Sequence, residues 1–163
     1  YNNERFLPKT MISYGDCLDF ISKLNAQTGL EFSLPTEAQW EYAARGGNKS
    51  RGYTYSGSND ASEVGWCYEN AATQVAIVGT KNSNELGLYD MTGNVNEWCS
   101  DWYGYYSDEA QTNPAGPDAG EFRVMRGGSV INFYDECRVS HRFGGKPDSH
   151  LYFVGFRLAL KDN

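Results

Sequence analysis

Residues 87–98 read GLYDMTGNVNEW, and CSDWYG continues the chain to residue 104. This stretch of 18 residues holds three carboxylates, two tryptophans and two asparagines. It is too polar for ordinary core and too aromatic for a solvated linker. We therefore expect specific interactions to hold it in a defined conformation.

A first helix is expected upstream of this stretch, in YGDCLDFISKLNAQTG. Ser13 is placed to cap its start and Gly29 to end it. Apolar side chains recur through it at helical spacing: Cys17, Leu18, Ile21 and Leu24. The helix should lie with this face on a core.

A second helix is expected in LPTEAQWEYAARGG. Thr36 and Gln39 have the spacing of a capping box, and Gly46 and Gly47 provide a stop. Its inward side should carry Trp40, Ala43 and Ala44.

The remaining chain is rich in loops. Residues 48–84 lack long periodicity apart from VAIVG at 75–79, a strand candidate, and NPAGPDAG reads as a turn-rich loop. FRVMRGGS and VGFRLAL read as strands, because apolar residues alternate in them: Phe122 and Val124, then Phe156, Leu158 and Leu160.

Length and charge bound the possible functions. The 163 residues suit a single domain spanning 1–163. A net charge of -7 with no basic cluster argues against nucleic acid as a partner, and no apolar run is long enough for insertion into a membrane. The four cysteines, Cys17, Cys67, Cys99 and Cys137, show no zinc-site spacing, so disulfides and buried thiols remain equally open.

Four blocks in this order, LPTEAQWEYAARGG, GLYDMTGNVNEW, RVMRGGS and GFRLA, resemble the formylglycine-generating-enzyme (sulfatase-modifying factor) family. The resemblance implies an α+β, C-type-lectin-like fold: two helices, small antiparallel sheets and extensive ordered loops. The family domain normally begins with further strands and a block containing threonine and tryptophan. We therefore expect this chain to lack the N-terminal strands.

The resemblance also implies one structural calcium ion at GLYDMTGNVNEW. It maps onto the side chains of Asp90 and Glu97 and the backbone carbonyls of Gly93 and Val95. Oxygen donors of this kind suit calcium rather than zinc. The alternative is that both carboxylates cap turns, or a short helix in NVNEWCSDW.

Enzymes of the family use two cysteines shortly after the GGS of RVMRGGS, which bind copper as thiolates. Here GGSVINFYDECRVSHR holds only Cys137, and the first cysteine position falls near Asn132. One thiol cannot form a two-thiolate site, so we expect neither copper nor catalysis. Cys137 then reads as a buried residue at the start of a strand in CRVSHR.

Binding should instead use the loops 130–135 and 143–154, which mix rings with small polar groups as antibody binding loops do. Phe133, Tyr134, Phe143 and Tyr152 are expected to be exposed, whereas Phe153 and Val154 could pack in the core. The full set of candidate ligand-binding residues is Val130, Ile131, Asn132, Phe133, Tyr134, Asp135, His141, Phe143, Gly144, Gly145, Ser149, His150, Leu151, Tyr152, Phe153 and Val154.

The order RGGS, CRVSHR, PD and GFRLA also looks like the variable proteins of diversity-generating retroelements, in which Glu136 and Lys146 would be fixed positions. The leading hypothesis is therefore a non-catalytic receptor for a protein or other macromolecular ligand. It would be secreted or at the cell surface, and encoded by a bacterium or phage. The alternatives are an oxidoreductase acting on cysteine and a structural domain of a surface lipoprotein or pilus.

Overall fold

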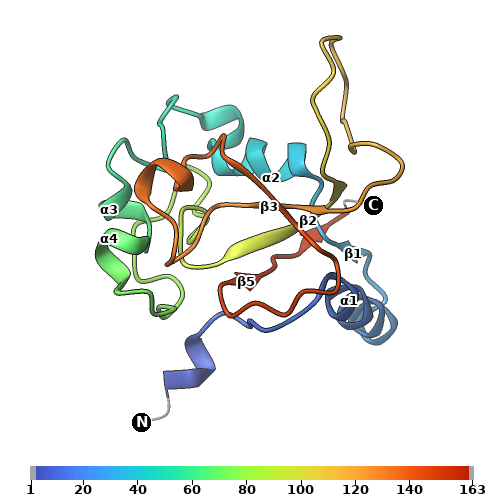
Figure 1. The fold of residues 1–163 in the computed structure, drawn as a ribbon, viewed down its shortest axis with the longest axis horizontal. Helices are drawn as coiled ribbons and strands as arrows, with labels where there is room; N and C mark the ends of the chain where they lie inside the picture. The colour runs from blue at the N-terminus through green and yellow to red at the C-terminus, as the bar shows by residue number, and fades with distance from the viewer. Residues whose placement is uncertain (1–2, 162–163) are drawn as a thin grey trace.

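The centre of the molecule is a four-stranded sheet. The structure, a computed structural model, describes residues 3–161. The strands are β2 (Asn96–Trp102), β3 (Arg123–Arg126), β4 (Arg142–Gly145) and β5 (Val154–Gly155), in the order β4-β3-β2-β5. β3 is antiparallel to both β2 and β4, whereas β5 is parallel to β2 (Figure 1).

A second, two-stranded sheet pairs β1 (Phe32–Ser33) with β6 (Ala159–Leu160). The expected single strand in VGFRLAL is therefore wrong, since its two ends belong to different sheets. Of the alternating apolar residues in this stretch, Leu158 is 38% exposed and Phe156 is only partly buried.

The first helix, α1 (Tyr14–Thr28), confirms the capping prediction. Ser13 accepts a hydrogen bond from the Asp16 amide, and the Asp16 carboxylate accepts one from the Ser13 amide. Gly29 ends the helix in the left-handed conformation. The buried stripe is narrower than expected, because Leu18 is 44% exposed.

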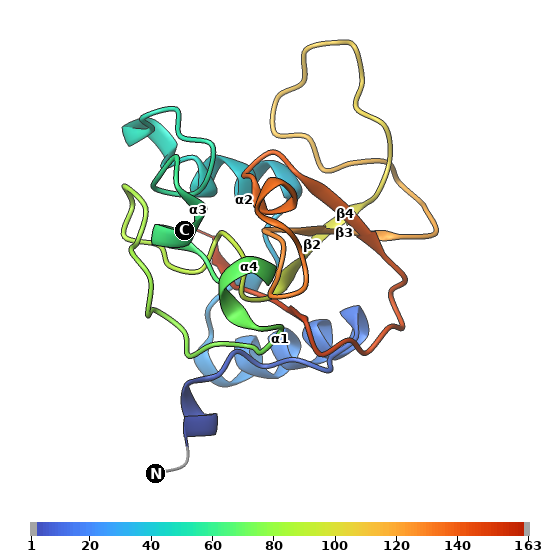
Figure 2. The same ribbon diagram turned by 60° about the vertical axis from the view of Figure 1, so that its left-hand side comes forward.

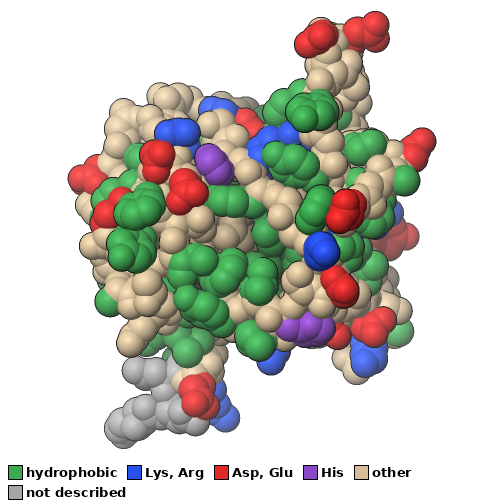
Figure 3. Space-filling model, viewed as in Figure 1, with side chains coloured by type: hydrophobic (Ala, Val, Ile, Leu, Met, Phe, Trp, Pro, Cys, Tyr) green, Lys and Arg blue, Asp and Glu red, His purple; other side chains and the backbone are tan. Residues whose placement is uncertain are grey.

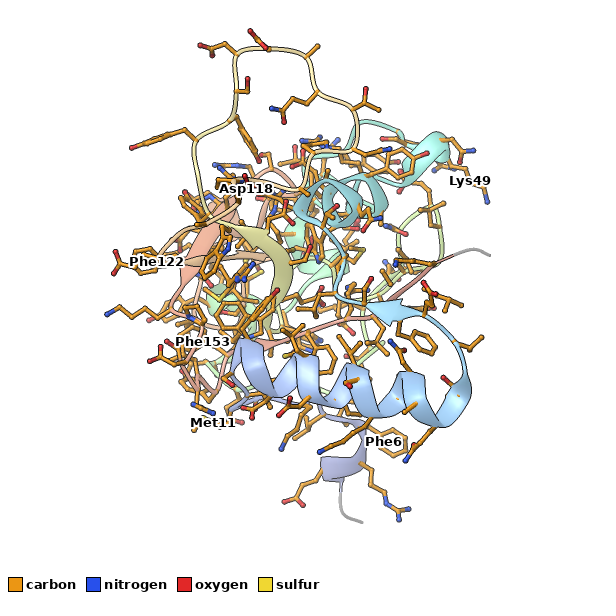
Figure 4. The ribbon with its side chains drawn as sticks, turned by 90° about the vertical axis from the view of Figure 1, so that its right-hand side faces the viewer. Phe6, Met11, Lys49, Asp118, Phe122 and Phe153 are labelled. Carbon is orange, nitrogen blue, oxygen red and sulfur yellow. The ribbon has the colours of Figure 1, made fainter. Side chains whose placement is uncertain are left out.

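The second helix, α2 (Glu37–Ala44), begins with the expected capping box of Thr36 and Gln39. Trp40 and Ala44 are fully buried against the central sheet, whereas Ala43 is partly buried. A 3-10 turn, η2 (Gly47–Lys49), follows directly. Figure 4 shows α2 below the long loop that joins β2 to β3.

Four short helical segments lie in the loops: η1 (Asn3–Phe6), α3 (Ala61–Val64), α4 (Tyr68–Ala71) and η3 (Tyr134–Cys137). The strand expected at 75–79 does not form. Instead, the amide side chain of Asn94 bonds both backbone groups of Ala76, at 3.0 and 3.1 Å. A side chain from the central motif thus replaces the missing strand partner.

Two further expectations are corrected near the sheet. Most of NVNEWCSDW forms strand β2, not a short helix, because this strand lies between two neighbours and its side chains are buried on both faces. Cys137 closes the η3 turn, whereas the strand begins only at Arg142.

The core has two clusters on either side of the sheet. One gathers Ile12, Tyr14, Cys17, Ile21, Leu34, Trp98, Met125 and Val154, and the other Trp40, Ala44, Met91, Cys99, Val124 and Val139. Within residues 3–161, no helix is long and apolar enough to cross a membrane.

Candidate binding face

The two loops expected to bind a ligand lie on one face of the molecule. Residues 130–137, β4 and residues 146–154 run across the side that faces the viewer in Figure 1, in front of β2 and β3. In the matching view, Figure 3 shows hydrophobic side chains gathered at the middle of this side and both histidines visible at its surface. In Figure 4 the same side lies at the left, where Phe122 and Phe153 are found.

Several rings on this side pack in pairs, and three of them, Tyr68, Phe133 and Tyr152, are exposed. Phe133 is 53% exposed and Tyr152 is 47% exposed. Phe133 packs on Tyr68 with ring centroids 4.9 Å apart, and His141 packs on Phe143 at 4.6 Å. We call the following set the aromatic face: Tyr68, Phe133, Tyr134, His141, Phe143 and Tyr152. Sequence reasoning missed Tyr68, because it comes from a helix distant in sequence.

Not every candidate residue is accessible. Val130 and Val154 are both fully buried and Gly145 is also buried, so these three cannot offer side chains to a ligand. Leu151 and Phe153 are partly buried against the core, and so is Phe143. Tyr134 is also partly buried, so the expectation that Phe143 and Tyr134 are exposed is wrong. These corrections have one cause: both loops attach to the sheet through apolar residues within the stretches that were expected to be accessible.

The remaining candidates lie around the rings. Asp135, Gly144 and His150 are exposed, whereas Ile131, Asn132 and Ser149 are partly buried. His150 sits at the start of α1, with its Nε2 3.0 Å from the Asp16 carboxylate.

Cys137 lies beneath this face and is fully buried. The sequence suggested that Cys137 has no second thiol beside it, but the Cys67 side chain lies against it. Contact with the Cys67 thiol, together with burial, raises the pKa of Cys137 far above its ordinary range. A buried, protonated thiol lacks the exposed thiolate of a catalytic cysteine.

The expected calcium loop, residues 87–98, carries two buried oxygens without a hydrogen-bond partner, one on Asp90 and the other Asn96 Oδ1. Asp90 Oδ2 accepts the Gly79 amide at 2.7 Å, whereas Oδ1 is buried without a hydrogen-bond partner. Burial raises the pKa of Asp90, and the nearby Glu97 carboxylate raises it further. An unpaired carboxylate oxygen in this setting suits a hard cation.

Glu97 differs, since its charge is already balanced. Its carboxylate accepts the Trp40 indole N–H at 2.6 Å and two hydrogen bonds from Arg157. Among residues 3–161, no three His, Cys, Asp or Glu side chains gather into a metal-binding group. The loop therefore fits a cation held by Asp90 and backbone carbonyls better than one surrounded by carboxylates.

A cavity that the sequence did not indicate lies between α2 and the loop connecting β2 to β3. Its volume is about 680 Å³, and Tyr42, Tyr106 and Pro117 contribute to its walls. Glu37 and Arg142 form part of its lining, joined by two hydrogen bonds of 2.6 Å. None of the candidate binding residues lines it, so it is separate from the aromatic face.

A solved structure shares this architecture. Treponema denticola variable protein 1 superposes with a TM-score of 0.89 and 28% identity, covering 96% of this chain and 72% of that chain. The molecule therefore has the C-type-lectin-like fold of the variable proteins encoded by diversity-generating retroelements, as the sequence predicted.

The family follows from the sequence match. Residues 1–162 match the model of the sulfatase-modifying factor enzyme 1-like domain, and the chain belongs to that family. It is 37% identical over 136 residues to "Chaperone protein LppX" of Paenibacillus barcinonensis, covering 73% of this chain and 45% of that protein. It is also 37% identical over 143 residues to the formylglycine-generating enzyme of Streptomyces coelicolor, covering 77% of this chain and 46% of that enzyme. The chain thus spans less than half the length of these two relatives.

Proposed function

We propose that this chain is a non-catalytic binding domain that recognises a protein or other macromolecular ligand through the aromatic face. The observation that carries the proposal is the pairing of accessible rings on loops held by a rigid sheet. Phe133 and Tyr152 are about half exposed, yet their neighbours Val130 and Val154 anchor the loops in the core. Rigid rings give contact area with little loss of conformational entropy.

The surroundings of Cys137 support binding over catalysis. An oxidoreductase acting on cysteine would need reactive sulfur at an accessible surface, whereas both sulfurs here are fully buried. The relatives named as formylglycine-generating enzymes make that activity the second candidate. Incubating the purified chain with a cysteine-containing peptide, copper(I) and oxygen tests it, and aldehyde formation would establish the enzyme.

Diversification by a retroelement is part of the proposal, supported by the likeness to the Treponema denticola protein. It predicts a reverse-transcriptase gene and a near-identical template repeat beside this gene. Substitutions between repeat and gene should fall at exposed ring positions such as Phe133 and Tyr152. If neither element lies near the gene, the proposal of diversification is refuted, whereas the proposal of a binding function is not affected.

We further propose that calcium occupies the Asp90 loop as a structural ion, held mainly by Asp90 and the Gly93 and Val95 carbonyls. Glu97 would add one oxygen, although both of its oxygens already accept hydrogen bonds. The unpartnered Asp90 Oδ1 supports this assignment. A secreted or cell-surface location would supply calcium at concentrations that suit weak structural sites.

Photo-crosslinking tests the binding face directly. A benzophenone amino acid replaces Phe133 or Tyr152 in the full-length protein, expressed in its native cells. The control carries it at Tyr42, which is 60% exposed but lines the separate cavity. We expect covalent adducts with another macromolecule at the first two positions only. Equal adducts at Tyr42, or none at Phe133 and Tyr152, would refute the assignment of the face.

A further inference from the structure

Two thiols distant in sequence meet beneath the aromatic face. Cys67 occupies the N-cap of α4, and Cys137 is the last residue of η3. Both are fully buried. Figures 1 and 2 show the two short helices near each other, at the left of the view in Figure 1.

Hydrogen bonds hold these helices together. The Tyr68 amide donates to the Asn132 carbonyl oxygen at 2.9 Å, and Cys137 Sγ lies 3.9 Å from that same oxygen. The Tyr134 amide donates to the Glu69 carboxylate at 3.0 Å. The two cysteine-bearing segments are therefore joined by hydrogen bonds next to the Cys137 sulfur.

Glycine backbone closes the space around both sulfurs. A Cβ added at Gly93 would lie 2.9 Å from Cys67 Sγ, and one added at Gly128 would lie 2.5 Å from Cys137 Sγ. The Gly93 amide also donates to the Gly127 carbonyl at 2.8 Å, which ties the two glycine segments together. Each thiol is thus closely enclosed by backbone that has no room for a side chain there.

The other two cysteines have no such relationship. Cys17 belongs to the core cluster under α1, whereas Cys99 belongs to the cluster under α2, on the other side of the sheet. Any internal cross-link between described residues should therefore form between Cys67 and Cys137.

We infer that Cys67 and Cys137 form a disulfide that joins α4 to η3 under the aromatic face. The two thiols lose two protons and two electrons, which a small disulfide such as oxidised glutathione accepts as it becomes two free thiols. Because both sulfurs are buried, the exchange occurs during folding or when η3 opens, and the folded reduced protein reacts slowly. This inference does not depend on the proposed function.

The cross-link would close a long loop of chain and so restrict the unfolded state. It would also hold in place the two backbone segments that carry Tyr68 and Phe133, whose ring centroids lie 4.9 Å apart. A binding surface on irregular loops gains affinity when its rings are already in place.

Peptide mapping of the whole chain tests the inference. The protein is refolded with reduced and oxidised glutathione, denatured, alkylated and digested without reduction. We expect one linked peptide pair containing Cys67 and Cys137, with two alkylated cysteines remaining. Four alkylated cysteines, a link to Cys17 or Cys99, or a metal ion retained by the thiol pair would overturn the inference.

Matched variants give a second measurement. The double variant Cys17→Ala/Cys99→Ala should keep the cross-link, and its urea midpoint should fall on reduction. Cys67→Ser should show no cross-link and no effect of reduction on its midpoint. If Cys67→Ser folds poorly, the wild-type peptide map still decides the question, and it needs no ligand.

Discussion

Arg157 and Glu97 form a two-pronged ion pair across the molecule, with Nε to Oε2 at 2.5 Å and Nη2 to Oε1 at 2.7 Å. Arg157 follows β5, whereas Glu97 lies in β2, so the pair joins the C-terminal segment to the central strand. The Trp40 indole donates to the same carboxylate, which adds α2 to the connection. Three elements thus share one buried anion.

Replacing Glu97 by Gln should therefore destabilise the fold substantially. The change leaves Arg157 with a neutral partner in a largely buried place, and removing one member of such a pair costs about 3 kcal/mol. Urea unfolding in the presence of a calcium chelator measures it. Glu31→Gln is the control, because its partner Lys161 is 68% exposed, and we expect a change within about 0.5 kcal/mol. Equal effects would contradict the structural role of Glu97.

Substituting two glycines by alanine distinguishes the cost of a left-handed backbone from the cost of steric crowding. Gly93 and Gly29 have almost the same φ, 72° and 71°, but only Gly93 is enclosed. Gly29→Ala should cost about 1 kcal/mol for the left-handed conformation alone. Gly93→Ala should cost at least about 2 kcal/mol more, because its Cβ would collide with the Trp66 carbonyl. Matched unfolding curves test this, and equal losses would show that the Gly93 site is open.

The stability of the protein should fall in acid through Glu37. Burial raises the pKa of Glu37, but hydrogen bonds and charge from Arg142 and Arg126 outweigh burial and hold it below the ordinary range. A depressed carboxylate pKa gives stability that is present above the unfolded value, about 4.3, and is lost as pH falls through the folded value. Urea midpoints across this window should fall more steeply in the wild type than in Glu37→Gln. Parallel profiles would exclude Glu37 as a major source of acid sensitivity.

The ionised Asp90 carboxylate should lower the stability of the fold without a cation, whereas the ionised Glu37 carboxylate raises it. Burial raises the pKa of Asp90, so its ionised form is penalised in the folded protein without a cation. In chelator at neutral pH, Asp90→Asn should be at least as stable as the wild type. In calcium at about 100 times its dissociation constant, the wild type should gain about 2.7 kcal/mol and the variant much less. Calorimetric melting compares them, and an identical response of both proteins to calcium would refute the site.

The helices could be predicted because their signals are local. The capping pairs Ser13 with Asp16 and Thr36 with Gln39 lie within one turn, and both are present in the structure. The strand expected at residues 75–79 does not form, because the side-chain amide of Asn94 makes the hydrogen bonds of the Ala76 backbone. No local pattern reports a contact made from that far along the chain.

The same distinction applies to the proposed binding face. Sequence composition indicated the two loops, and the structure places both on the same side of the molecule. It could not indicate that Val130 and Val154 would turn inward, or that Tyr68 would complete a ring pair with Phe133. Each of these depends on how the loops meet the core, which is a property of the assembled sheet.

The long connection between β2 and β3 leaves and re-enters the sheet at adjacent positions, because Trp102 and Arg123 are register partners. Its ends are therefore fixed together whatever lies between them, and Figure 1 shows the rest projecting from the body of the molecule. Loop closure costs only slightly more when such an excursion grows. A foreign peptide or a fluorescent reporter inserted there should leave strand pairing unchanged, which makes this projection a practical graft point for engineering the domain.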